Sequence, residues 1–132
     1  FHLYLKQRPD LKARFGVEAR FRPSGDHGND RMPDVFLRFT DAPRVTQGPV
    51  VGIPDIAVEI KSPNDSYKSM REKADYYLAN GSLMVWLIFP EKHIVEVYQP
   101  DVDIQILQPG DVITGGTLLA EFKLAVSDLF DA

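Results

Sequence analysis

The segment PDIAVEIKSP, residues 54–63, decides the fold class of this chain. Between its two prolines, apolar and polar side chains alternate over residues 55–61, which is the pattern of a β-strand with one buried face. Ile56, Val58 and Ile60 form the apolar face of this strand, and the other side chains project from the opposite face. We therefore predict a strand that packs against a hydrophobic core and ends at the second proline.

The segments that follow this strand predict an α+β fold. Residues 66–80 carry apolar side chains at helical spacing, and residues 83–89 are almost continuously apolar, as in a strand that is buried on both faces. A strand, a helix and a second strand of these lengths predict a right-handed βαβ crossover between parallel neighbouring strands. We expect a mixed β-sheet flanked by helices, with additional antiparallel strands toward the C-terminus.

Shorter signals place the remaining elements. Alternating side chains indicate strands, and clusters of Gly, Pro, Asn and Ser indicate turns. The predicted elements are a helix from His2 that stops near Gln7, strands at residues 17–22 and 33–39, a turn at 23–29, a loop at 40–54, a hairpin strand at 94–98, strands at 103–108 and 116–122, and a helical turn at 127–130.

The whole chain has the length and composition of one globular domain, which we place at residues 1–132. Hydrophobic residues make up 44% of it, which excludes disorder as the main state. No apolar run approaches the roughly 18 residues of a membrane span. The chain contains no Cys, so we expect a reducing, cytoplasmic location and no disulfide. With a net charge of -4, any contact with nucleic acid must use a local patch or a bound cation.

The polar face of the strand at 55–61 carries the chemistry that stands out. Glu59 and Lys61 project from this face about 7 Å apart, and buried charges of this kind need partners. Asp34 begins the preceding strand and would lie opposite them if the two strands paired antiparallel. Two carboxylates and the backbone carbonyl of Ile60 would form an oxygen site suited to Mg²⁺ or Mn²⁺.

Other interpretations of these residues stay open at this point. Asp34 could serve only to cap a strand, and Glu59 and Lys61 could be a structural ion pair beside a solvent channel. Asp55 shares the face of Glu59 and is a further candidate for touching the metal. Tyr77 fits the apolar face of the predicted helix, so we interpret it as a core residue.

Pro33-Asp34, followed after 24 residues by Glu59-Ile60-Lys61, resembles the motif of the PD-(D/E)XK nuclease superfamily. A longer pattern is similar to the Uma2 family, also called DUF820, of restriction-endonuclease-like proteins. It comprises RMPDV at 31–35, PDIAVEIKSP at 54–63, residues 73–77, Gly81, VWL at 85–87 and the tail at 119–130. The resemblance covers roughly residues 14–132, and we expect the N-terminal part of the family to be missing.

The resemblance implies a metal-dependent endonuclease, with DNA as the expected nucleic acid. Asp34, Glu59 and the carbonyl of Ile60 would hold Mg²⁺ or Mn²⁺. Lys61 would orient or activate the attacking water or neutralise developing charge, and Lys73 would be a second, supporting cation, unless it is a solvated helix lysine. The resemblance also implies a homodimer. The alternative is a catalytically inactive module that kept the fold and binds nucleic acid or a protein partner.

Overall fold

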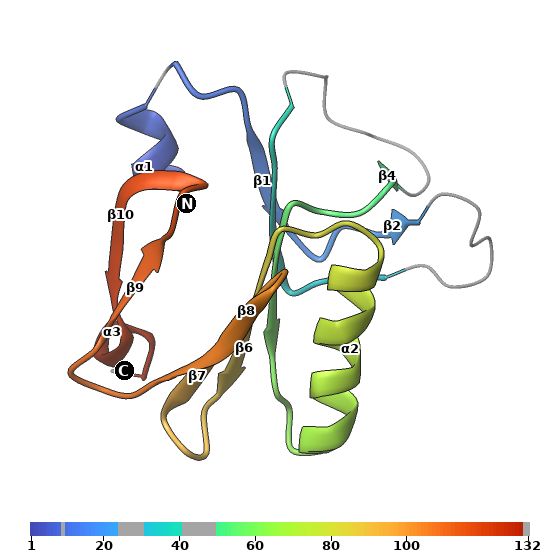
Figure 1. Ribbon diagram of the computed structural model, residues 1–132, viewed down its shortest axis with the longest axis vertical. Coiled ribbons are helices and arrows are strands. Elements are labelled where there is room, and N and C mark those ends of the chain that lie inside the picture. Colours follow the sequence, from blue (N-terminus) through green and yellow to red (C-terminus); the bar gives the residue numbers. More distant parts are fainter. Residues whose placement is uncertain (9, 24–30, 41–49, 131–132) are drawn as a thin grey trace.

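The computed structural model describes residues 1–8, 10–23, 31–40 and 50–130 (Figure 1). None of the described helices is long and apolar enough to span a bilayer. The elements, in chain order, are α1 (His2–Lys6), β1 (Arg14–Val17), β2 (Phe21–Arg22), β3 (Val35–Arg38), β4 (Val50–Val51), β5 (Ile56–Ile60), α2 (Tyr67–Ala79), β6 (Met84–Phe89), β7 (Ile94–Gln99), β8 (Val102–Leu107), β9 (Val112–Gly115), β10 (Leu119–Ala125) and α3 (Val126–Phe130).

The fold is α+β and is built on a six-stranded mixed sheet in the order β1-β3-β5-β6-β7-β8. Strands β5 and β6 are parallel, and α2 connects them, while the other neighbours in this sheet are antiparallel. The prediction of parallel neighbours joined by a helix is thereby confirmed. Because β3 runs antiparallel to β5, the start of β3 lies beside the end of β5.

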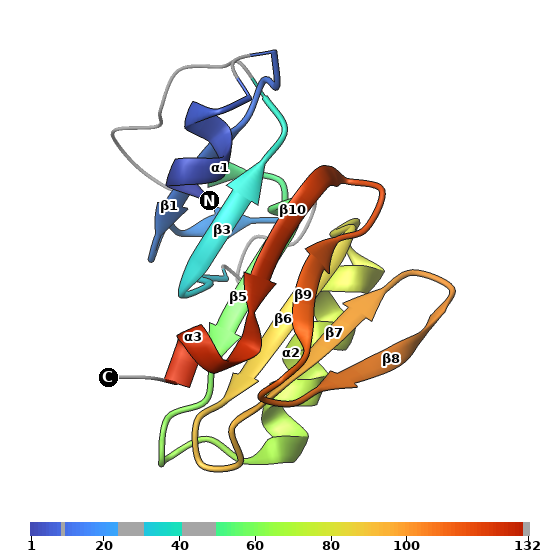
Figure 2. The ribbon, with the colours of Figure 1, turned by 90° about the vertical axis from the view of Figure 1, so that its left-hand side faces the viewer.

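The sheet has a hydrophobic core on each face. Helix α2 covers one face, where Met70, Ala74 and Tyr77 are fully buried. The β9–β10 hairpin covers the opposite face, with Ile113 and Leu119 in its core, and Figure 2 shows the hairpin in front of the sheet and α2 behind it. Strand β6 lies between the two layers, so all six of its residues are buried, as predicted.

Local sequence explains where α2 begins and ends. Ser66 caps the helix: its hydroxyl accepts a hydrogen bond from the backbone nitrogen of Ser69 at 2.9 Å, and the hydroxyl of Ser69 accepts one from the backbone nitrogen of Ser66 at 3.2 Å. At the other end, Gly81 adopts a positive φ of 110°, a conformation that suits glycine just after a helix. These two signals frame the helix predicted at residues 66–80.

Three predicted segments differ from the structure. The strand expected at 17–22 is divided, because Glu18 adopts a positive φ of 51° and turns the chain between β1 and β2. Strand β4 forms within the loop expected at 40–54 and pairs with β2. Strand β9 was not predicted, and β10 starts at Leu119 rather than at residue 116. Residues 41–49 of the loop and 24–29 of the predicted turn lie outside the described residues.

Candidate active site

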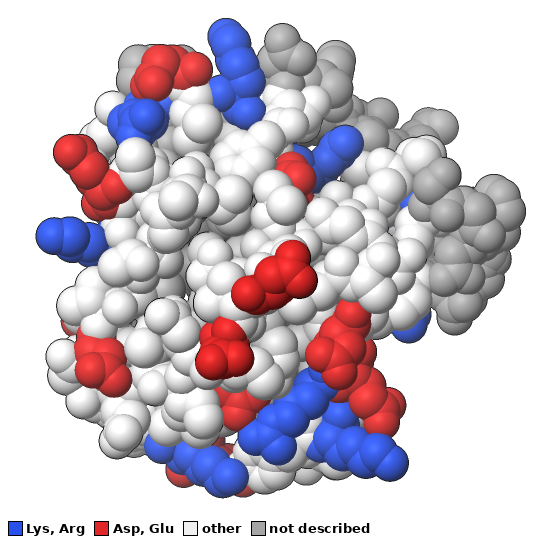
Figure 3. Space-filling view, viewed as in Figure 1, with Lys and Arg blue, Asp and Glu red and all other residues white. Residues whose placement is uncertain are grey.

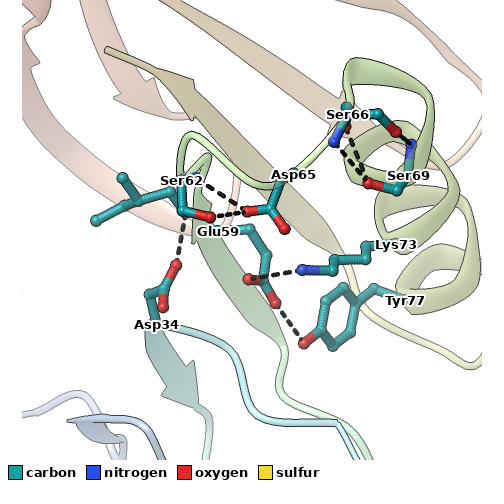
Figure 4. Close-up of polar contacts among 9 residues, drawn as sticks. Asp34, Glu59, Ser62, Asp65, Ser66, Ser69, Lys73 and Tyr77 are labelled. Carbon is teal, nitrogen blue, oxygen red and sulfur yellow. Dashed lines mark hydrogen bonds and ion pairs between the residues drawn. The ribbon is translucent and has the colours of Figure 1, made fainter.

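The candidate site forms where β3 begins and β5 ends. Val35 pairs with Val58 in the antiparallel register, so continuing the register by one residue places Asp34 opposite Glu59. Asp34 is half-buried, whereas Glu59 is only 6% exposed. The antiparallel pairing that the sequence made a condition for a shared site is therefore present, and Figure 4 shows both carboxylates at this end of the sheet.

Asp34 links the two strands through one of its oxygens. Its Oδ2 accepts a hydrogen bond of 2.6 Å from the backbone nitrogen of Ile60, the residue whose carbonyl is a candidate metal ligand. Among the described residues, no donor is bonded to its other oxygen, Oδ1. Asp34 thus holds β3 against the end of β5, as the capping interpretation required, and also keeps one oxygen available to a ligand.

Glu59 is a buried carboxylate with incomplete charge compensation. The hydroxyl of Tyr77 donates a hydrogen bond of 2.9 Å to its Oε1, and Nζ of Lys73 lies 4.0 Å from its Oε2. Burial raises the pKa of Glu59 to about 7; Tyr77 and Lys73 oppose this shift, while the charges of Asp34 and Asp65 add to it. The native site therefore holds a proton on Glu59 far more readily than an exposed glutamate would.

The two candidate lysines have different partners. Lys73 is the ion-pair partner of Glu59, so the structure places the helix lysine at the site. Lys61 has a side chain only 6% exposed, and its Nζ lies 3.6 Å from Oε1 of Glu91 and donates to the carbonyl of Ser62 at 3.3 Å. The alternative of a structural Glu59–Lys61 ion pair is therefore wrong, because each residue of that pair has another partner.

Asp55 lies at the opposite end of β5 from the site. Its Oδ2 accepts a hydrogen bond of 2.6 Å from the backbone nitrogen of Phe39, at the end of β3. Four residues along a strand span about 13 Å, which separates Asp55 from Glu59 by more than one metal ion can bridge. The hypothesis that Asp55 touches the metal is wrong, because its carboxylate secures the far end of the β3–β5 pair.

Two residues of the site were missed from the sequence. Tyr77 is fully buried, as a core residue would be, but its hydroxyl also orients Glu59, and burial raises its own pKa so that it stays a donor. The available signal was its position four residues after Lys73, which puts both on one side of α2. Asp65 accepts hydrogen bonds of 2.9 Å from the backbone nitrogen and the hydroxyl of Ser62, and no spacing predicted that turn's proximity to Glu59.

The donor set at this site fits a small divalent cation. In the part of the chain that the structure describes, no three His, Cys, Asp or Glu side chains gather into a complete metal cage. Mg²⁺ does not need one, because it keeps several waters and is commonly held by one or two carboxylates together with substrate phosphates. Asp34 and Glu59 are two carboxylates on neighbouring strands that such an ion could use, and the raised pKa of Glu59 indicates a position where burial outweighs the nearby positive charge of Lys73.

Comparisons with known proteins place this geometry in a family. No curated protein matches the chain. A crystal structure from Anabaena variabilis ATCC 29413, described as "a putative nuclease belonging to DUF820", is similar to it with a TM-score of 0.79 and 26% identity, over 98% of this chain and 74% of that one. The family model "Uma2: Putative restriction endonuclease" matches residues 1–127. This chain therefore belongs to the Uma2 family, as its sequence motifs had indicated.

Proposed function

We propose that this protein is a metal-dependent phosphodiesterase that cleaves nucleic acid, with DNA as its substrate. The observation that carries the proposal is the pairing of Asp34 with a buried Glu59 whose pKa is raised to about 7. A buried carboxylate that its nearest cation, Lys73 at 4.0 Å, does not fully compensate is costly, and a divalent ion would remove that cost. Membership of a restriction-endonuclease-like family supports the same reaction class.

The residues of the site would divide the work. Asp34, Glu59 and the carbonyl of Ile60 would hold Mg²⁺ or Mn²⁺. When bound, such an ion lowers the pKa of a water molecule and stabilises negative charge on the phosphate. Lys61 would orient the attacking water or contact the phosphate, as the family resemblance implies. Lys73 lies next to Glu59. Its ammonium would therefore offset the negative charge that develops on the phosphate oxygens in the transition state.

The direct test combines metal binding with cleavage. Calorimetry with Mn²⁺ and single-turnover cleavage of a supercoiled plasmid should both give signals with the parent protein. Glu59→Gln should remove both, and Glu121→Gln, on the distant β10, should remove neither. If the parent protein cuts neither DNA nor RNA with any divalent metal, the enzyme proposal fails and the non-catalytic binding module stands.

A homodimer completes the proposal, and the exposed edge of the sheet supports it. Strand β8 ends the six-stranded sheet, and Val102, Ile104 and Ile106 on it are each more than half exposed. A two-fold antiparallel pairing centred on Ile104 would place these apolar residues opposite one another and Asp103 opposite an uncharged Gln105. Light scattering should give a dimer mass that Ile104→Lys converts to a monomer; a monomeric parent at micromolar concentrations would contradict this pairing.

A further inference from the structure

Three basic side chains surround the ring of Tyr67 at the first turn of α2. Lys92 Nζ lies 4.1 Å from the ring centroid, Lys61 Nζ 5.0 Å and Arg71 Cζ 5.9 Å. The ring is itself packed against Phe89 of β6, with 5.2 Å between centroids. The two lysine nitrogens are thus held within about 9 Å of each other, because each is close to the same fixed ring.

The three cations differ in how fully their charge is compensated. Arg71 donates two hydrogen bonds to the buried Glu96, at 3.2 and 2.8 Å. Lys61 has Glu91 at 3.6 Å, and the side chain of Glu91 is 62% exposed. Across the described ranges, no carboxylate lies within ion-pair distance of Lys92. Lys61 also lowers the pKa of Asp65, and Lys92 lowers that of Glu96, so the charge of the two lysines is partly balanced without a direct ion pair to Lys92.

This cluster lies next to the candidate active site. Lys61 follows Glu59 by two residues, and both side chains lie on the side of the sheet that α2 covers. The first turn of α2 contains no acidic residue, and Asp65 directly precedes its N-cap, Ser66. Figure 3 shows Lys and Arg side chains over the lower part of α2 in the view of Figure 1, with Asp and Glu side chains beside them.

We propose that Lys92 and Lys61, held against Tyr67, bind a backbone phosphate of the DNA substrate beside the phosphodiester that is cut. This inference rests on the proposed function for the choice of ligand. Lysine ammonium groups bind phosphate as compact point charges, and a phosphate between them would meet two donors and the positive end of a helix. Such a contact reads no base, so it would position the strand without selecting its sequence.

Glu91 occupies the place that the phosphate would take beside Lys61. The pair is exposed on the glutamate side only, because the side chain of Glu91 is 62% exposed and that of Lys61 is 6% exposed, so a phosphate would approach Lys61 from the side that Glu91 covers. The glutamate would then compete with the substrate for Lys61. Removing its charge should strengthen DNA binding, an outcome that a purely structural ion pair would not produce.

The experiment measures binding separately from cleavage. A short fluorescein-labelled DNA duplex is titrated by fluorescence anisotropy, in EDTA and in the Glu59→Gln background, at several salt concentrations. Lys92→Ala should weaken binding about fivefold, the scale of one exposed charge contact, and lower the slope of log K against log salt by about 0.9. Glu91→Gln should tighten binding about threefold by the same reasoning. The matched controls, Lys123→Ala and Glu121→Gln on β10, should change neither quantity.

Each outcome decides for or against the proposal. If Lys92→Ala binds DNA like Lys123→Ala, or if the parent protein binds no DNA at low salt, the phosphate contact is wrong. If binding depends on Lys92 while the parent protein cleaves nothing with any metal, the contact stands and the nuclease proposal fails. Cleavage by the parent protein together with unchanged binding by Lys92→Ala would retain the nuclease and remove this contact.

Discussion

Two buried glutamates on the same face of the sheet have opposite electrostatic surroundings. Glu96 on β7 receives two hydrogen bonds from Arg71 and one of 2.9 Å from the hydroxyl of Tyr98. Burial alone would raise the pKa of Glu96, but these hydrogen bonds outweigh it and hold the pKa below the usual value. Glu59 on β5 has Lys73 only at 4.0 Å, and burial raises its pKa to about 7.

The difference separates a structural carboxylate from one that is available for chemistry. Glu96 is satisfied within the protein, because a guanidinium binds both of its oxygens in a fixed geometry. Glu59 is held in place by Tyr77 but is left short of positive charge. Buried titratable groups with shifted pKa values are typical of functional sites. Glu96, which lies on the same face and is fully paired, shows what the pKa of a purely structural glutamate is in this sheet.

The largest effect expected concerns the reaction itself. Glu59→Gln keeps the size of the side chain but removes the ionisable oxygen, so plasmid cleavage should fall by about 10³-fold or more, the scale of losing a group that acts on the transition state. Glu96→Gln should reduce the single-turnover rate by less than about tenfold, because its carboxylate is tied to Arg71. Equal losses in the two variants would remove the distinction between the two glutamates.

The next effect is on stability. Here a substitution beside Glu96 should have a larger effect than one beside Glu59. Arg71→Ala leaves Glu96, 2% exposed, without its cation, so the free energy of unfolding should fall by about 3 kcal/mol. Lys73→Ala should cost about 1 kcal/mol or less, since its contact with Glu59 is longer and its side chain is partly exposed. Urea unfolding of both variants checks this, and a larger loss for Lys73→Ala would contradict it.

The titration of Glu59 should contribute to the pH dependence of the free energy of unfolding. Because its folded pKa lies above the ordinary value of 4.5, the native state binds this proton more tightly than the unfolded chain, and stability is lost as pH rises from about 4.5 to 7. Between pH 5.5 and 8 the loss should be about 2 kcal/mol. Glu59→Gln should lack this component, which is read as the difference between its urea unfolding curves and those of the parent protein. Parallel pH profiles for the two proteins would be evidence against a raised pKa.

The smallest effect tests the hydrogen bond that orients Glu59. Tyr77→Phe removes only a hydroxyl, so unfolding at pH 8 should become easier by about 1 kcal/mol, the usual contribution of one hydrogen bond. At pH 5.5 the loss of stability should be smaller, because the hydrogen bond from Tyr77 stabilises a protonated Glu59 less than it stabilises the carboxylate. Tyr98→Phe is the matched control: since Arg71 remains on Glu96, its loss should not vary between these two pH values.

The sequence predicted the backbone of the site well, because alternation and helical spacing report directly on β5, α2 and β6. It predicted that Asp34 would lie opposite Glu59 on the condition that the two strands paired antiparallel, and the structure shows that pairing. It did not predict which lysine meets Glu59, because the partner depends on how α2 is rotated against the sheet. Nor did it predict the turn at Glu18, where a residue other than glycine adopts a positive φ without any local signal.

The hydrogen bond from Ile60 to Asp34 has a consequence for reading relatives of this protein. Under the proposed function, a relative that lost nuclease activity would still be under selection to keep this aspartate for folding, because Asp34 holds two strands together. The contacts of Glu59 with Tyr77 and Lys73 do not offset its burial, which raises its pKa and which, in the proposed function, a bound metal would relieve. After a loss of activity, Glu59 should therefore be substituted before Asp34. Among sequences that contain both β3 and β5, the glutamate is then the better marker of an active enzyme.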